Sequence, residues 1–230
     1  MDKARIVVLT GAGISAESGL STFRGNGGLW EGHDIQEVAS PQGFKKNPEM
    51  VLRFYNERRQ QAKSAQPNAG HKALVELEEK YEVWIITQNV DDLHEKAGSS
   101  NILHLHGELN KARSATDENY VIEIQDDINI GDLGPNGGQM RPHIVWFGED
   151  VPKINDAIEI MTTASLVIIV GTSLVVYPAA GLVHYAPMET PICVVDPNKP
   201  ELSSEREVFF IEEPATRGLP TLVQRLLKEV

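Results

Sequence analysis

Continuous apolar runs that end in glycine or in small polar residues recur along the chain. Several have the character of strands buried on both faces of a parallel sheet, namely residues 6–9, 83–87, 102–105, 166–170, 192–195 and 208–211. Segments with helical spacing of apolar residues lie between them, at residues 49–65, 71–81, 93–97, 154–161, 178–186 and 219–227. This alternation predicts an α/β fold with a Rossmann-like, doubly wound parallel sheet.

Two segments interrupt the alternation. Residues 25–48 are rich in glycine, asparagine, proline and serine, and we expect a long ordered loop there with a short helix at 35–39. Residues 108–141 are mixed polar with a short strand at 120–124, and an apolar segment at 144–147 then returns the chain to the alternation. We therefore predict a single domain, 1–230, with a large part made of residues 1–30, 68–107 and 142–230 and a small inserted module made of residues 31–67 and 108–141.

The first apolar run breaks into a glycine turn at residues 11–15. We expect Gly11 and Gly13 to take positive φ and to let a ligand approach the backbone, with Ser15 or Glu17 beginning a helical turn. Free N–H groups at that turn would then face a phosphate. Because the segment lacks the full G-x-G-x-x-G pattern, a plain tight turn is the alternative.

Polar clusters follow the predicted strands at residues 11–15, 88–91, 106, 171–173 and 196–198. Each has a purely structural interpretation: a helix N-cap at 171–173, an Asx-type turn at 88–91, or a hydrogen-bonded core histidine at His106. Ligands of doubly wound sheets collect at the carboxyl ends of the strands, where all these clusters would meet. Together they favour a nucleotide-consuming enzyme in which His106 acts as a base near neutral pH.

Charge and cysteine content narrow the partners and the location. The net charge of −12 argues against nucleic acid and anionic membranes and suits a cationic partner such as a lysine-rich protein segment. The single cysteine, Cys193, excludes an intrachain disulfide and a multi-cysteine metal site. Neither a signal peptide nor an apolar run of about 18 residues is visible, so we expect a cytoplasmic protein.

A set of motifs in a fixed order carries a resemblance: GAGISAESGLSTFRG, TQNVDDLHEKAG, HLHGE, RPHIVWFGE and GTSLVVYPAA. Over nearly the whole chain these resemble the sirtuin family of NAD-dependent protein-lysine deacylases. The resemblance implies a Rossmann-type domain with a smaller inserted module. It also implies that NAD is consumed while acyl groups are removed from protein lysines, giving nicotinamide, O-acyl-ADP-ribose and free lysine.

The resemblance also assigns roles to residues. It implies that His106 and Asn89 are the catalytic residues, with His106 as the general base. The implied NAD site consists of Gly11, Ala12, Gly13, Ser15, Glu17, Phe23, Arg24, Trp30, Gln88, Asn89, Asp91, Gly171, Thr172, Ser173, Asp196, Asn198 and Ala215. The implied acyl-lysine peptide site consists of Tyr55, Arg58, Val145, Phe147, Gly148, Glu149, Val175 and Tyr177.

Two features refine the resemblance. Most sirtuins hold the small module with four cysteines on zinc, whereas residues 107–140 contain none, so no zinc and no other metal is expected. Tyr55 and Arg58 resemble the Tyr-x-x-Arg pair of CobB-type bacterial sirtuins, which implies removal of succinyl or malonyl as well as acetyl groups. The alternative is that both residues have a structural role only, with Tyr55 packed in the core and Arg58 on the solvated face of the same helix.

Three other functions stay open at this point. A mono-ADP-ribosyltransferase would use the same scaffold and co-substrate. A catalytically silent NAD or ADP-ribose binding module is opposed by the intact His106 and Asn89. A hydride-transferring dehydrogenase is disfavoured by the Gln-Asn-x-Asp cluster at residues 88–91.

Overall fold

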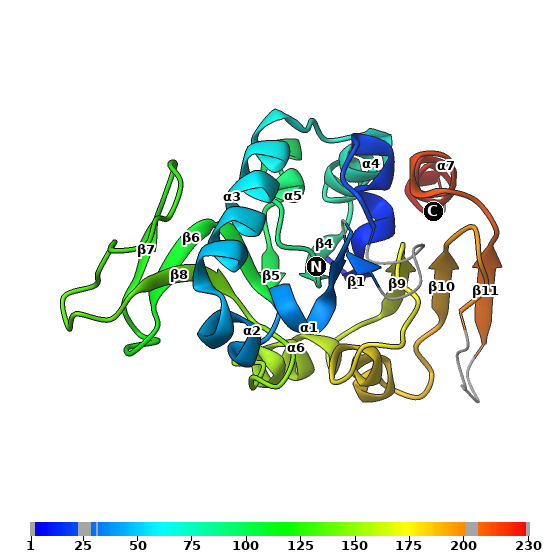
Figure 1. Ribbon diagram of the computed structural model, residues 1–230. Helices are drawn as coiled ribbons and strands as arrows, with labels where there is room; N and C mark the ends of the chain where they lie inside the picture. Colours follow the sequence, from blue (N-terminus) through cyan, green and yellow to red (C-terminus); the bar gives the residue numbers. More distant parts are fainter. Residues whose placement is uncertain (1–2, 23–28, 31, 201–206, 229–230) are drawn as a thin grey trace.

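The structure is a computed structural model that describes residues 3–22, 29–30, 32–200 and 207–228. Its centre is a parallel sheet of strand order β11-β10-β9-β1-β4-β5 (Figure 1). The strands are β1 (Arg5–Thr10), β4 (Glu82–Thr87), β5 (Ile102–His104), β9 (Leu166–Val170), β10 (Ile192–Val195) and β11 (Val208–Ile211). The order reverses at β1, which lies between β4 and β9. The predicted α/β class with a doubly wound parallel sheet is thus confirmed, and the reversal marks where such sheets bind ligands.

Helices cover both faces of this sheet. Helices α4 (Ala69–Leu77) and α7 (Ala215–Lys228) lie side by side on one face, and α6 (Ile154–Met161) and the 3-10 helix η3 (Ala179–Tyr185) lie on the other (Figure 1). Alternate residues of β1 point to opposite faces, so Ile6 and Val8 pack under α4 and α7 while Val7 and Leu9 join the core with α6 and η3. Burial on both faces explains the unbroken apolar runs. Residues 178–186 were expected to be helical, and they form the tighter 3-10 type.

Residues 32–48 are more regular than the predicted loop. They contain β3 (His33–Asp34), which pairs with β2 (Leu29–Trp30), followed by α1 (Ile35–Val38) and α2 (Pro41–Lys46). The α1 helix confirms the short helix expected at 35–39, whereas α2 was missed. Its start was readable in the sequence, because Ser40 accepts a hydrogen bond from the Gly43 N–H and Pro41 follows it. The long helix α3 (Pro48–Ser64) comes next.

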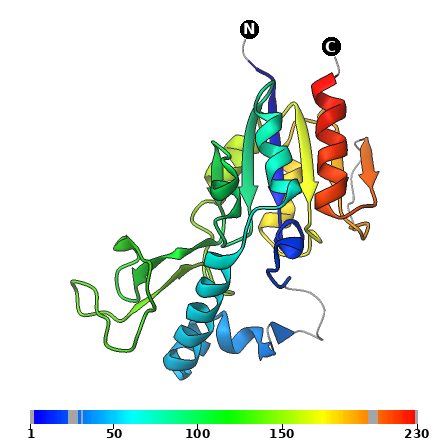
Figure 2. The ribbon, with the colours of Figure 1, turned by 90° about the horizontal axis from the view of Figure 1, so that it is seen from above.

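A second, antiparallel sheet projects away from the main one (Figure 2). It consists of β6 (Gly107–Ser114), β7 (Val121–Glu123) and β8 (Met140–Ile144), in the order β7-β6-β8. The apolar segment at 144–147 overlaps β8 only at Ile144. Pairing with β6 uses residues 140–144, with Gly107 opposite Ile144 and Ser114 opposite Met140. The proposed boundaries between a large part and a small module stay a prediction.

Helix α3 holds the inserted sheet and its loops in place. The Asn56 side chain donates to the Ile128 carbonyl and accepts from the Ile128 N–H, at 2.9 and 3.0 Å. The Arg59 guanidinium donates to the Leu109 carbonyl at 2.6 Å. Leu52 of α3 also belongs to a small apolar cluster with Ala112, Ile128 and Met140. Hydrogen bonds from α3 side chains to backbone groups and a local apolar core therefore fasten the insertion.

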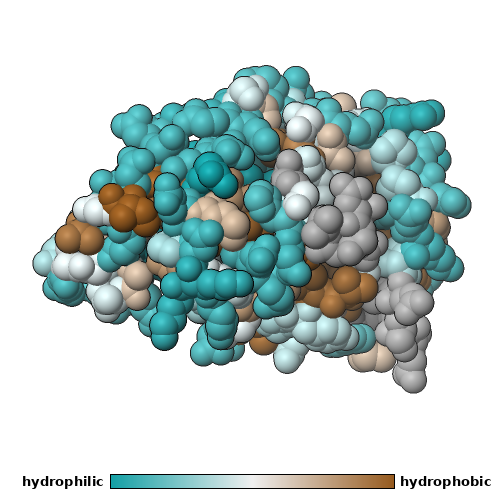
Figure 3. Space-filling model, in the orientation of Figure 1, coloured by the Kyte–Doolittle hydropathy of each residue, from teal (hydrophilic) through white to brown (hydrophobic). Residues whose placement is uncertain are grey.

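The surface is mostly hydrophilic on the face shown in Figure 3, with apolar patches that include one over the inserted sheet. The exposed apolar side chains of the insertion are Val121, Ile122, Ile130 and Leu133. Among the described residues, none of the helices combines the length and the apolar character needed to cross a membrane.

Candidate active site

The glycine turn after β1 packs directly against the turn after β9. A Cβ atom on Gly11 would lie 2.7 Å from the Thr172 Cβ atom, and one on Gly13 would lie 2.5 Å from the Gly171 Cα atom. The expectation of positive φ is wrong here, since Gly11 has φ −129° and Gly13 is not among the residues with positive φ. Glycine is required instead because two backbone turns approach each other too closely for a side chain, and only Gly171, at φ +59°, needs left-handed freedom.

The residues after Gly11 form two 3-10 helices, η1 (Ala12–Ile14) and η2 (Ala16–Ser18), with Ser15 between them. Ser15 is the N-cap residue of η2, in agreement with the helical turn expected to begin there, but its side chain makes no capping hydrogen bond. Its hydroxyl donates to the Asp91 carboxylate at 3.0 Å. The Ser15 hydroxyl therefore binds Asp91, in the segment after β4, and does not bind a backbone N–H of η2.

Asn89 and Asp91 lie buried under the glycine turn. The Asn89 amide donates to the Gly11 carbonyl and to the Ser15 hydroxyl, both at 3.2 Å. Burial raises the pKa of the Asp91 carboxyl, while hydrogen bonds from the Leu93 N–H and from Ser15 oppose that rise. The ends of β1 and β4 are thus joined by polar side chains that were predicted to converge.

Gln88 extends the same network toward β9. Its side-chain amide donates to the Thr172 hydroxyl at 3.0 Å, and its backbone N–H donates to the Thr10 carbonyl at 3.0 Å. Clusters that are about 80 residues apart in sequence therefore meet at the carboxyl edge of β9, β1 and β4. Ser173 follows and is half-buried.

His106 follows β5 at the same edge and is half-buried. Its Nδ1 atom lies 3.2 Å from the Gln88 carbonyl oxygen, which can only accept, so the ring carries its proton on Nδ1 and leaves Nε2 as an acceptor. Burial lowers the pKa of His106, and the Gln88 carbonyl offsets part of that effect. A neutral imidazole near neutral pH is the form that a general base needs.

The segment after β8 is tied to His106 and to α1. The Val145 N–H donates to the His106 carbonyl at 2.9 Å, and the Phe147 N–H donates to the Ala39 carbonyl at 2.9 Å. Gly148 has φ +90°, which a residue with a side chain rarely adopts. Phe147 is 39% exposed, and farther along the chain Val175 and Tyr177 are 65% and 74% exposed. These are the apolar side chains predicted to contact a peptide.

Glu149 has a different role from the one expected of a residue that contacts peptide. Its carboxylate accepts from Arg141 at 2.6 Å, from Arg113 at 2.9 Å and from the Trp146 N–H at 2.8 Å. Burial alone would raise the pKa of Glu149, but the two guanidinium groups hold it below its ordinary value. Arg141 also lies over the Trp146 ring, 3.2 Å from its centroid. This internal ion network fixes the loop 145–149, and its two arginines were not anticipated from the sequence.

The residues predicted for the adenosine side lie around the start of α7 and the end of β10. The Asn198 N–H donates to Asp196 at 2.8 Å in an Asx-type turn. Glu17 accepts from the Thr216 hydroxyl at 2.6 Å, next to Ala215 at the first position of α7. Two further predicted NAD ligands, Phe23 and Arg24, lie outside the described residues.

Tyr55 and Arg58 both project from α3 into an aromatic cluster with Trp30. Tyr55 is fully buried, and its hydroxyl accepts a hydrogen bond from the Trp146 indole at 2.9 Å. Burial raises its pKa above the ordinary range. The Arg58 guanidinium stacks on Trp30, 4.2 Å from the ring centroid. Trp30 packs in this cluster, and its assignment to the NAD site, which the resemblance implied, stays a prediction.

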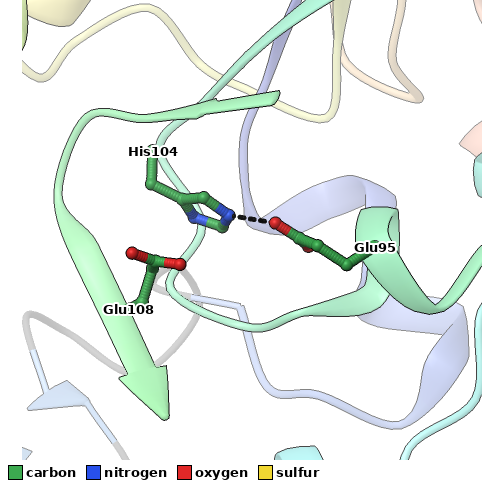
Figure 4. Close-up of side chains that lie close together, drawn as sticks. All are labelled: Glu95, His104 and Glu108. Atoms are coloured by element: carbon green, nitrogen blue, oxygen red, sulfur yellow. Dashed lines mark hydrogen bonds and ion pairs between the residues drawn. The ribbon is translucent and has the colours of Figure 1, made fainter. Parts of the chain in front are cut away.

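A cluster that the sequence reasoning missed lies beside the site (Figure 4). Glu95 of α5 (Leu93–Ala97), His104 at the end of β5 and Glu108 of β6 bring ligand-type atoms within 4.8 Å of one another. The His104 Nε2 atom lies 2.7 Å from Glu95, and Lys111 lies 2.7 Å from Glu108. A donor set of this kind could hold a divalent cation, but here a ring proton and a lysine already balance the carboxylates. The sequence signal was the His-x-His spacing, which places both rings on one side of an extended chain.

Comparisons with known proteins agree with this geometry. The protein-family model described as "Sir2 family" matches residues 11–178. An NAD-dependent protein deacylase of Helicobacter pylori (strain J99 / ATCC 700824) is 54% identical over 223 residues, which cover 97% of this chain and 95% of the relative. 

Solved structures give the same answer. A Sir2 homologue in complex with NAD has a TM-score of 0.85 and 38% identity, covering 98% of this chain and 90% of its own. A Sir2 protein bound to an acetylated peptide has a TM-score of 0.76 and 29% identity, covering 98% of this chain and 93% of its own. The family motifs are present in order, their polar residues gather at one sheet edge, and the family model, the curated relative and the solved structures agree: this chain belongs to the Sir2 family.

Proposed function

We propose that this chain is an NAD-dependent protein-lysine deacylase, which consumes NAD and releases nicotinamide, an O-acyl-ADP-ribose and free lysine. One observation carries the proposal. The buried Asn89 contacts the glycine turn and a neutral His106 contacts the neighbouring Gln88, at the carboxyl edge of the sheet, where doubly wound folds bind nucleotides. The deacylase relatives share about half of their residues with the chain over nearly its whole length.

NAD would enter along the two closely packed turns at Gly11–Gly13 and Gly171–Thr172. The two turns lie at the carboxyl edge of the sheet, where doubly wound folds bind nucleotides, and their close packing at Gly11, Gly13 and Gly171 fixes the backbone there. Gln88, Asn89 and Asp91 would line the ribose and nicotinamide region. Ser173, Asn198 and Ala215 would lie on the adenosine side.

His106 would serve the reaction through Nε2. Breaking the nicotinamide–ribose bond develops positive charge at the ribose carbon, and the amide oxygen of an acyl-lysine is a weak nucleophile that must be held in line with it. A neutral imidazole can take a proton from a ribose hydroxyl and so raise the nucleophilicity of that oxygen. The Gln88 carbonyl keeps the ring in the required tautomer.

The peptide would bind along residues 145–149 as an added strand, with Val175 and Tyr177 on its other side. The exposed rings of Phe147 and Tyr177 support this placement. The net charge of −12 suits lysine-rich segments and disfavours nucleic acid and anionic membrane surfaces as partners. The cytoplasmic location is part of the same proposal.

Arg58 and Tyr55 would extend the substrate range to acidic acyl groups, as in CobB-type sirtuins. A guanidinium can pair with the terminal carboxylate of a succinyl group through two N–H donors. The Tyr55 hydroxyl accepts from Trp146, and a phenol that accepts one hydrogen bond can still donate its own proton to another partner. The ion network at Glu149 would hold the Trp146 loop that supports this hydroxyl.

Mass spectrometry of the products tests the proposal. Acetyl-lysine and succinyl-lysine peptides of identical sequence are incubated with NAD and, as the control, without it. Loss of the acyl mass from the peptide together with O-acyl-ADP-ribose is the expected result. A peptide that keeps its acyl group and gains ADP-ribose would instead indicate a mono-ADP-ribosyltransferase. An unchanged peptide with bound NAD would indicate a silent binding module.

A further inference from the structure

Two histidines of the His-x-His segment contact successive carbonyls of the loop after β4. The Nδ1 atom of His106 lies 3.2 Å from the Gln88 carbonyl, and the Nδ1 atom of His104 lies 3.1 Å from the Asn89 carbonyl. The two rings therefore hold consecutive peptide groups of the segment that carries Asn89. Their second nitrogens face different surroundings.

The second nitrogen of His104 faces a carboxylate. Nε2 lies 2.7 Å from Glu95, and only 9% of the His104 side chain is exposed (Figure 4). The other charged or titratable groups around this ring are Asp91 after β4, His94 on α5, and Glu108 and Lys111 on β6. Burial alone would lower the pKa of His104, but Glu95 and, more weakly, Glu108 raise it above its ordinary value.

Hydrogen-bond chemistry fixes the charge of this ring. A backbone carbonyl and a carboxylate can only accept, so both ring nitrogens of His104 must donate, and only the doubly protonated ring does so. A neutral ring would set a lone pair against one of the two oxygens. His104 is thus charged, whereas His106, two residues farther on, is neutral.

Asn89 is held on all sides. Its N–H donates to the Thr87 hydroxyl at 3.0 Å, its side chain donates to Gly11 and Ser15, and its carbonyl accepts from His104. The His104 contact fixes the plane of the peptide group that follows Asn89. Without it, that group could rotate and shift Asn89 relative to the glycine turn.

We propose that His104, held by Glu95, is a positioning residue for the deacylase reaction and that its protonated ring fixes the carbonyl of Asn89. This inference rests on the proposed function. Activity then requires opposite protonation states at two neighbouring histidines, a neutral His106 and a charged His104. The rate should fall on the acid side as His106 is protonated and on the alkaline side as His104 loses its proton.

Two substitutions of His104 separate its two contacts. An asparagine amide nitrogen lies near the position of Nδ1 and can still donate to the Asn89 carbonyl, whereas a glutamine amide nitrogen lies near Nε2 and reaches Glu95 instead. We expect H104Q to lower kcat about 10- to 100-fold, as misplaced catalytic groups do, and H104N to retain most of it. Equal kcat values in wild type and H104Q would overturn the proposal.

The pH profile of kcat is a second test, because a general loss of stability would not shift the pH values at which its two limbs fall. Glu95→Gln removes the charge that keeps His104 protonated, so the alkaline limb should move to lower pH while the acid limb stays. Glu82→Gln is the matched control, because it removes the charge of another 2.8 Å ion pair, with Arg5, at the opposite end of the sheet. It should leave both limbs in place. An alkaline limb unchanged in Glu95→Gln would contradict the proposal.

An NMR titration of the histidine rings in the free wild-type protein tests the charge without any reaction. The His104 ring should carry both protons at pH 7 and the His106 ring one. A neutral His104 ring at that pH would overturn the inference even in an active enzyme. A charged His104 in a protein that shows no NAD-dependent deacylation would instead count against the proposed function and leave the ring's charge established.

Discussion

At the scale of single residues, the position of His106 just past β5 sets its chemistry. The ring is buried enough for its pKa to be lowered, and the Gln88 carbonyl selects the tautomer with a free Nε2 acceptor. Neither property can be read from the residue type, since both depend on the neighbouring strand. The sequence identified the histidine because it ends an apolar run, and the structure supplies the reason why its ring is neutral and has a free acceptor nitrogen.

Replacement of His106 by alanine should abolish most deacylation. Loss of a general base typically costs about 10²- to 10⁴-fold in rate, and we expect a fall of kcat in that range. NAD binding measured by calorimetry should change little, because the contacts among Gly11, Asn89 and Ser15 do not involve the ring. Turnover close to the wild-type rate in a folded His106→Ala protein would refute its role as the base.

Arg58 gives a second prediction at this scale. In Arg58→Met, desuccinylation should fall at least about tenfold, mainly through KM, while deacetylation changes little, since only the succinyl group offers a carboxylate to the guanidinium. Methionine keeps an unbranched side chain against Trp30, where the guanidinium now stacks. Parallel kinetics on the two peptides measure the effect. Equal loss on both substrates would mean that Arg58 serves the packing of α3 alone.

At the scale of elements, the loop 145–149 depends on one buried ion network. Arg141 and Arg113 are 5% and 9% exposed, and Glu149 is their shared partner. Removing one member of a buried pair leaves charges without compensation, which costs about 3–5 kcal/mol. The loop is therefore rigid only as long as β6, β8 and Glu149 stay together.

Glu149→Ala should accordingly lower the free energy of unfolding by about 3 kcal/mol and raise KM for the peptide, because the loop loses its anchor. Urea unfolding and steady-state kinetics measure the two effects. Asp156→Ala is the control: it breaks an exposed pair with Lys153, at 2.9 Å, that should contribute less than about 1 kcal/mol. If both substitutions cost the same, the network is not a special anchor.

Prediction from sequence succeeded for elements with a local signal and failed for those defined by pairing. The strands of the main sheet are apolar runs, so β1 and β9 were placed within a residue or two of their bounds. Strand β6, with the sequence GELNKARS, lacks an apolar run, and it is a strand because β8 pairs with it across the insertion. The Tyr55–Trp146 contact joins residues that are far apart in sequence, and the Arg141–Glu149 contact depends on the conformation of the loop after β8. Residue spacing in the sequence could not reveal either contact.

At the scale of the whole molecule, the question is how a projecting sheet stays attached without the cysteines that most sirtuins use. The chain has a single cysteine, Cys193, which lies in β10 of the main sheet. Burial raises the pKa of its thiol to about 11, so it is a poor metal ligand. The attachment comes instead from α3, through the hydrogen bonds of Asn56 and Arg59 and the apolar cluster around Leu52.

The purified protein should therefore contain no stoichiometric zinc, and a chelator should change neither its melting temperature nor its activity. A structural zinc contributes folding free energy directly, so its removal would be visible in both measurements. Asn56→Ala, in contrast, should destabilise the insertion by about 1–3 kcal/mol, because it leaves the buried N–H and carbonyl groups of Ile128 without their partner. Stoichiometric zinc in elemental analysis, lost with chelator together with a drop in melting temperature, would show that metal rather than α3 holds the inserted sheet.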